Sequence, residues 1–166
     1  MKRKRRSSVW RALIEAKTRE RRRVEADIEA AQAALAEAQT AVEARQDTLR
    51  QAEQRLDDHL RSMDDLTTGP SLTAQAYLQY DAYRTQLEGG VGQAEQAVAA
   101  AQGVVAEREA ALQAQRRKLA RLDAMLERCR ETADRLDRKE DAERELATEE
   151  EAVEAILARA RYTTTH

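Results

Sequence analysis

Two histidines and one cysteine are the residues of this chain best suited to acid–base, nucleophilic or metal chemistry. His59 and Cys129 lie far apart in the sequence, and His166 is its last residue. No grouping of His, Cys and Asp has the short, regular spacing of metal ligands. A nucleophile would also need a base and a group that orients it. The sequence therefore predicts no catalytic residue, no metal and no cofactor, and we expect a protein that is not an enzyme.

A glycine run, GGVG at residues 89–92, is of the kind that cradles phosphate groups in nucleotide-binding loops. It lacks the Lys-Ser/Thr pair of such loops, and no strand precedes it. Each glycine inside a helix costs about 1 kcal/mol relative to alanine. We interpret the run as a weak turn of helix that bends or frays.

Charge is divided unevenly along the chain. Residues 1–23 carry a net charge of +9, and the remainder carries −11. A basic arm of this kind is typical of a solvated terminus, of docking on an acidic protein surface, or of binding to nucleic acid or anionic lipid. Because aromatic residues are not interleaved with the basic ones, nucleic acid is the disfavoured alternative.

Three of the four tyrosines gather in one segment, Tyr77, Tyr80 and Tyr83. Helical spacing places Tyr77, Tyr80 and Arg84 on one face, with Tyr83 beside it. Tyrosine and arginine dominate binding hot spots, so we predict an exposed patch that binds a partner. A purely structural role, capping the end of a helical hairpin, is the alternative.

The heptad spacing of apolar residues predicts the helices that position these residues. Apolar residues recur in 4-3-4-3 spacing, which is typical of a coiled coil. The first seam runs through Trp10, Ile14, Val24, Ile28, Ala31, Leu35, Ala38, Val42, Arg45, Leu49, Ala52, Leu56, His59 and Met63. The second runs through Leu87, Val91, Ala94, Val98, Ala101, Val105, Arg108, Leu112, Gln115, Leu119, Leu122, Leu126, Cys129, Ala133 and Leu136.

A break separates the seams at Gly69-Pro70, which is a typical end of a helix. Ser71 or Thr73 is suited to cap the next helix. Two seams joined by a short turn pair in antiparallel fashion, with residue numbers that sum to about 138. Trp10 would then lie near Arg128, and the second helix would outrun the first by roughly 30 residues.

The fold class is therefore all-α, an antiparallel two-helix coiled-coil hairpin that forms an elongated rod. We expect residues 1–166 to form a single unit, with helix 1 over about 8–66, a turn over about 67–72 and helix 2 over about 73–160. No apolar stretch is long enough for a membrane span, and the basic start lacks the apolar region of a secretory signal. These features predict a cytoplasmic protein without membrane insertion.

Three stretches resemble the FliJ/YscO (SctO) family, the stalk proteins of bacterial type III export machines. They are RRRVEADIEAAQAALAEAQ after the basic start, YLQYDAYRTQLEGGVGQAEQAV after the turn, and the charged tail RKEDAERELATEEEAVEAIL. The GGVG run and the absence of Phe depart from the flagellar members, which favours an injectisome version.

The resemblance implies a central stalk that links a hexameric secretion ATPase to the cytoplasmic domain of the export gate, with export chaperones as further partners. It places the protein at the cytoplasmic face of a membrane-embedded machine and implies no cofactor. We expect Tyr77, Tyr80, Tyr83 and Arg84 to bind the gate or a chaperone. At the end with both termini, the residues expected to face the ATPase ring are Arg3, Arg5, Arg6, Arg11, Arg138 and Lys139.

Two alternatives remain from the residues alone. One is an unrelated coiled-coil scaffold, for which self-association at micromolar concentration would be the sign. The other is a protein that binds nucleic acid through residues 1–23, with an affinity that falls steeply with salt. The seams also fit both a single hairpin and a helix-exchanged dimer.

Overall fold

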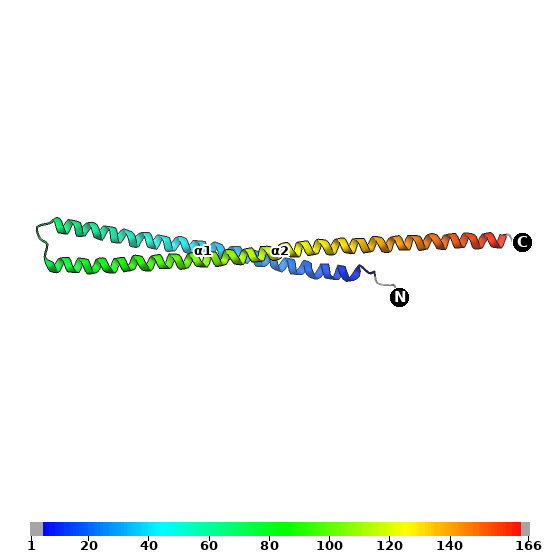
Figure 1. Cartoon of the computed structure of the whole chain (residues 1–166), viewed down its shortest axis with the longest axis horizontal. Helices are drawn as coiled ribbons and strands as arrows, with labels where there is room; N and C mark the ends of the chain where they lie inside the picture. The colour runs from blue at the N-terminus through cyan, green and yellow to red at the C-terminus, as the bar shows by residue number, and fades with distance from the viewer. Residues whose placement is uncertain (1–4, 164–166) are drawn as a thin grey trace. The chain divides into compact units, whose positions relative to one another are not determined.

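The computed structural model describes residues 5–163, which form two helices, α1 (Ser8–Thr68) and α2 (Ala74–Thr163) (Figure 1). No strand occurs among these residues. The all-α class predicted from the heptad phase is confirmed. The helix bounds differ from the expected ones by three residues at most.

The turn between the helices has the expected chemistry. The Gly69 amide donates a hydrogen bond to the Leu66 carbonyl (3.3 Å), which closes the last turn of α1. The Thr73 hydroxyl accepts a hydrogen bond from the Ala76 amide (3.2 Å), and the Thr73 carbonyl accepts one from the Tyr77 amide (3.0 Å). Of the two candidate caps, Thr73 is therefore the one that satisfies the first free amides of α2.

The chain divides into two units, and each helix contributes to both. Unit 1 comprises Met1–Ala26 and Arg116–His166, and unit 2 comprises Asp27–Gln115. Each unit is a pair of antiparallel helical segments. In unit 2 the segments are joined by the turn, so this unit is a helical hairpin (Figure 1).

Unit 2 is held together by its seam. Its seam residues are buried or half-buried, from Ile28 to Met63 on α1 and from Leu87 to Gln115 on α2, apart from Arg45 and Arg108. These two arginines extend from seam positions into solvent, which long basic side chains can do while their stems remain packed. Both seams predicted from the sequence therefore form the contact surface of this hairpin.

Unit 1 packs the start of α1 on the second half of α2. Its fully buried apolar residues include Val24 on α1 and Leu126 on α2. Cys129 and Ala133 are buried in the same seam, as expected for small residues at these positions. Trp10 and Ile14, the backward extension of the first seam, are half-buried.

Residues that meet across the two helices have numbers whose sums lie near the predicted value of about 138. Within unit 2, His59 contacts Tyr80, and their numbers sum to 139. Within unit 1, Trp10 and Arg128 line the same hollow of the surface, as predicted. The polar pairs Ser7 with Asp137 and Arg21 with Asp123 each sum to 144. The predicted register is therefore correct to within a few residues.

The expected fraying at the glycine run is wrong. α2 continues as helix through residues 89–92, and no described glycine has a positive φ angle. A Cβ atom added at Gly89, Gly90 or Gly92 would meet nothing within 4 Å. The glycines therefore serve neither a close approach of the helices nor an unusual backbone conformation, and they remain only a source of low helix propensity.

Replacing Gly89 and Gly90 with alanine should stabilise the protein. Each substitution should raise the free energy of unfolding by about 1 kcal/mol, because alanine loses less backbone entropy in a helix and has open space here. Urea unfolding followed by circular dichroism measures the change. The control is Gly69→Ala, outside both helices, which should give no such gain. A loss of stability in the double variant would show that α2 is interrupted at this run in solution.

Candidate partner-binding sites

The predicted aromatic patch is divided between the seam and the surface. Tyr80 and Arg84 lie seven residues before the seam residues Leu87 and Val91, so they continue the seam toward the turn. Both are half-buried, whereas Tyr77 and Tyr83 are exposed by 42% and 50%. The patch is therefore not one continuous exposed surface.

His59 of α1 joins the two helices at this point. Its ring stacks on Tyr80, with centroids 5.3 Å apart and planes 16° apart, and it meets Tyr83 edge-on at 4.9 Å. Its Nε2 atom lies 2.8 Å from the carbonyl oxygen of Tyr80. Since a carbonyl only accepts, Nε2 must carry the proton. His59 is thus a half-buried seam residue, as expected, with a specific hydrogen bond to α2.

Arg84 is engaged on its own helix. It donates hydrogen bonds to Asp81 (2.7 Å) and Glu88 (2.9 Å). The hydrogen bond to Asp81, together with the charges of Glu88 and Asp81, raises the pKa of the guanidinium. Its charge is balanced locally, so Arg84 is a weaker candidate for partner binding than its residue type implied.

Exposed apolar side chains nevertheless gather around the turn. We call them the tip surface, which consists of Leu60, Leu72, Tyr77, Leu78 and Tyr83. The three leucines were not predicted from the sequence. The available signal was that they are large apolar residues outside the seam, next to a turn, where burial by the partner helix is not expected.

The basic residues expected to face a partner near the N-terminus are paired with α2. Arg5 lies 3.6 Å from Asp137 and 3.5 Å from Asp141. Arg6 lies 4.0 Å from Glu143. Arg3 lies outside the described residues. We call this set of contacts the N-terminal clasp, which joins Arg5, Arg6, Ser7 and Arg11 to Asp137, Glu140, Asp141 and Glu143.

Asp137 is the centre of the clasp. It accepts hydrogen bonds from the Ser7 hydroxyl (2.6 Å) and from Arg11, and its side chain is only 13% exposed. The hydrogen bonds from Ser7 and Arg11 lower the pKa of Asp137 against the opposing effect of burial. The Arg6 backbone amide also donates to Glu140 (2.7 Å). A charged hydrogen-bond network therefore fixes the start of α1 on α2.

Ser7 was not predicted to matter, yet it is completely buried. Its carbonyl accepts a hydrogen bond from the Arg11 amide (2.9 Å), which starts the first turn of α1. Serine just before a helix is a common capping residue, and this was the signal in RRSS at residues 5–8. Here its hydroxyl binds the other helix instead.

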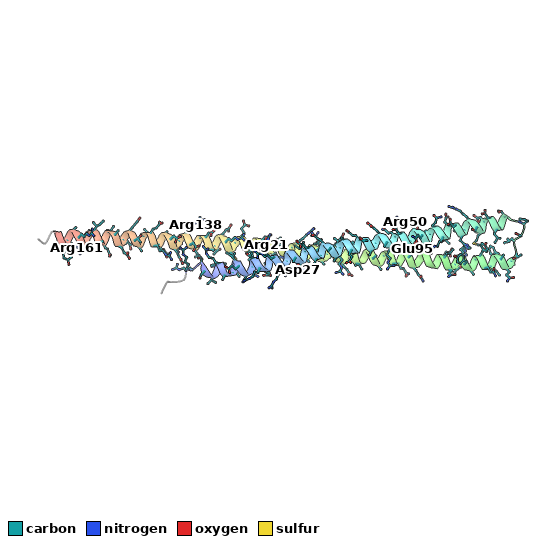
Figure 2. All side chains as sticks on the ribbon, turned by 180° about the vertical axis from the view of Figure 1, so that it is seen from behind. Arg21, Asp27, Arg50, Glu95, Arg138 and Arg161 are labelled. Carbon is teal, nitrogen blue, oxygen red and sulfur yellow. The ribbon has the colours of Figure 1, made fainter. Side chains whose placement is uncertain are left out.

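Arg138 and Lys139, also predicted to face a partner, lie exposed on α2 next to the clasp (Figure 2 labels Arg138). The side chains of Arg5, Arg6 and Arg11 remain 45–60% exposed despite their ion pairs. Exposed ion pairs are weak and exchange readily. All five residues are exposed basic residues of unit 1, and three of them are already partly neutralised within the chain.

The residues that the structure describes contain no cluster of His, Cys, Asp and Glu that could hold a metal ion. Within the same residues, neither helix contains an apolar stretch long enough to cross a membrane. Two antiparallel helices with heptad seams define a coiled-coil protein, and the exposed apolar residues at the turn and the basic residues of unit 1 are its candidate binding sites.

Comparison with protein-family models identifies the family. Residues 5–160 match the model of the bacterial type III secretion protein HrpB7. The match covers nearly the whole chain, so the chain belongs to this family. Comparisons with curated proteins and with solved structures found no match. The role in type III secretion implied by the resemblance is therefore confirmed at the level of the family.

Acid should release the N-terminal clasp. Because the pKa of Asp137 is lowered in the folded chain, its contribution to stability is present above the unfolded value of about 3.9 and is lost as the pH falls below it. Trp10 is the only tryptophan and lies in the same unit, so its fluorescence should shift to the red as the start of α1 detaches.

Asp137→Asn should produce this shifted emission already at neutral pH and should abolish the acid step. Asp141→Asn is the matched control, because its carboxylate is 52% exposed and solvent weakens its pairing with Arg5. Equal behaviour of the two variants would show that the clasp does not depend on Asp137.

Proposed function

We propose that this protein is a central stalk component of a type III secretion export apparatus, which links the hexameric secretion ATPase to the cytoplasmic domain of the export gate. The observation that carries the proposal is the family match over residues 5–160, since it assigns the chain to type III secretion. The resemblance to FliJ/YscO stalk proteins supplies the finer role. The protein would act on the cytoplasmic face of the membrane-embedded machine, without catalysis of its own.

The distribution of surfaces supports a linking role. A protein that connects two partners needs two binding surfaces of different chemistry. The tip surface in unit 2 is apolar and aromatic, and the surface around Arg138 and Lys139 in unit 1 is charged. Each helix contributes to both units, so the two surfaces are carried by the same two helices.

We assign the tip surface to the export gate and to export chaperones. Tyr77 and Tyr83 are the exposed members of the aromatic cluster, and aromatic side chains contribute strongly to binding because they bury a large area at low entropic cost. Tyr80 and Arg84 support this surface from the seam: Tyr80 stacks on His59, and Arg84 donates hydrogen bonds to Asp81 and Glu88.

We assign the charged surface of unit 1 to the ATPase ring. Its basic members are Arg5, Arg6, Arg11, Arg138 and Lys139. Because the first three already hold acidic residues of α2, a partner that binds here must either exchange these ion pairs or use Arg138 and Lys139. The same pairing opposes the nucleic-acid alternative, since it reduces the charge available to phosphates.

Reciprocal variants test the proposal. Purified chain is measured against the secretion ATPase and the gate domain of the same bacterium. Tyr77→Ala with Tyr83→Ala should weaken gate binding at least tenfold and leave ATPase binding unchanged, because two exposed aromatic anchors are lost. Arg138→Glu with Lys139→Glu should do the reverse. The control is Val104→Ala, an exposed position of unit 2 outside both surfaces.

Absence of binding to both purified partners by the unaltered chain would overturn the stalk assignment. Loss of both activities in either double variant, with helicity retained, would show that the two partners share one surface.

A further inference from the structure

The last part of α2 carries apolar side chains that lie on its surface. Beyond the clasp, Leu146, Val153, Ile156 and Leu157 are exposed by 60%, 54%, 66% and 53%. In Figure 1, the orange-to-red end of α2 continues past the start of α1 with no described segment beside it. Four large apolar residues on one short stretch of helix are more than scattered surface residues usually provide.

These residues form a single stripe. Leu146 and Val153 are seven residues apart, Leu157 follows four residues later, and Ile156 lies at its edge. This is the spacing of a heptad seam; Leu146 and Val153 lie one residue off the phase of the seam that ends at Leu136, and Leu157 lies in that phase. At a rise of 1.5 Å per residue the stripe is about 17 Å long, or three helical turns. The spacing and length of the stripe are therefore those of a surface that packs against another helix.

Acidic residues border the stripe on both sides. Helical geometry places Glu150 and Glu154 along one side, and Glu145 and Glu149 along the other. Glu149, Glu150 and Glu154 line a shallow groove together with Leu146 and Val153. We call these eight residues the overhang surface. In coiled coils, residues that flank the seam select the charge of the partner.

The contacts between α1 and α2 in unit 1 show what kind of helix packs on α2. The start of α1 places apolar residues such as Val24 on the α2 seam and presents arginines to the flanking acids. Arg21 contacts Asp123 at 2.5 Å, and Arg11 contacts Asp137. The contacts from Arg6 reach Glu143, three residues before the stripe begins. The overhang surface repeats the same combination of apolar seam and acidic flank.

We propose that the overhang surface binds a basic amphipathic helix of a partner protein, one with apolar residues at heptad spacing and Lys or Arg beside them. A second copy of this chain fits less well. In a self-pair of this surface, Glu150 and Glu154 of both copies would face one another, and like charges across a seam oppose pairing. The proposal rests on α2 alone and does not require the stalk function.

Designed peptides test the chemistry of the partner directly. The first is a helical peptide of about 20 residues with Leu and Val at the seam positions and Arg and Lys beside them. The second has Glu in place of each basic residue. The third has the composition of the first with its heptad phase scrambled. Fluorescence anisotropy measures the binding of each labelled peptide to the full chain at physiological salt.

The first peptide should bind at least tenfold more tightly than the other two. Val153→Ser with Leu157→Ser should weaken this binding by about tenfold or more, because the seam contact is lost. The control is Val104→Ser with Met125→Ser, two apolar residues that are each 44% exposed elsewhere on α2 and belong to neither binding surface, which should leave it unchanged.

Four outcomes would overturn the proposal. They are failure of the basic peptide to bind, equal binding of the scrambled peptide, insensitivity to the Val153/Leu157 variant, and self-association of the peptide-free chain that this variant abolishes. The last outcome would make a second copy the occupant. None of these results bears on the ATPase and gate measurements, so the two proposals fail separately.

Discussion

The structure depends on the single narrow contact surface, the seam, between α1 and α2. Among residues 5–163 no third element covers the two paired helices, and most seam residues are consequently half-buried. Only a few, such as Val24 and Leu126, are almost completely enclosed. The hydrophobic contribution of each contact is therefore partial. Alanine at alternating positions, as at Ala38, Ala94 and Ala133, lets the backbones approach closely and compensates for the narrow contact. A seam of this kind stabilises pairing over a long contact and leaves most of the surface free for other proteins.

A repeating seam specifies pairing better than it specifies register, so other interactions must set the register. In unit 2 this is the His59 contact, in which ring stacking and a hydrogen bond to the Tyr80 carbonyl accept only one alignment. In unit 1 it is the clasp, where the buried Ser7 hydroxyl and Arg11 meet Asp137. Polar contacts of low exposure are costly when mispaired, which is why they discriminate between alignments that apolar contacts accept equally.

Features that depend on sequence periodicity could be predicted from the sequence. Contacts between residues far apart in the sequence could not. Heptad phase located both seams, and Gly69, Pro70 and Thr73 located the turn and its cap, because these signals are local. The clasp joins residues about 130 positions apart, and nothing in a single sequence pairs Ser7 with Asp137. The tyrosines show the same limit. They were predicted to form one exposed patch, but extending the seam phase back by seven residues would have shown that Tyr80 faces α1.

The clasp and the overhang surface also explain why acidic residues are concentrated between Asp137 and Glu154 of α2. Up to Glu143 the acids of α2 hold the arginines of α1, so there the charge is used within the chain. Beyond that residue the same pattern continues where no described segment of α1 lies beside α2, and the apolar stripe from Leu146 to Leu157 continues with it. If the tail were only a solubilising segment, charge without heptad spacing would suffice. A solubilising segment does not need apolar residues at heptad spacing. This spacing therefore identifies the segment as one half of a coiled coil.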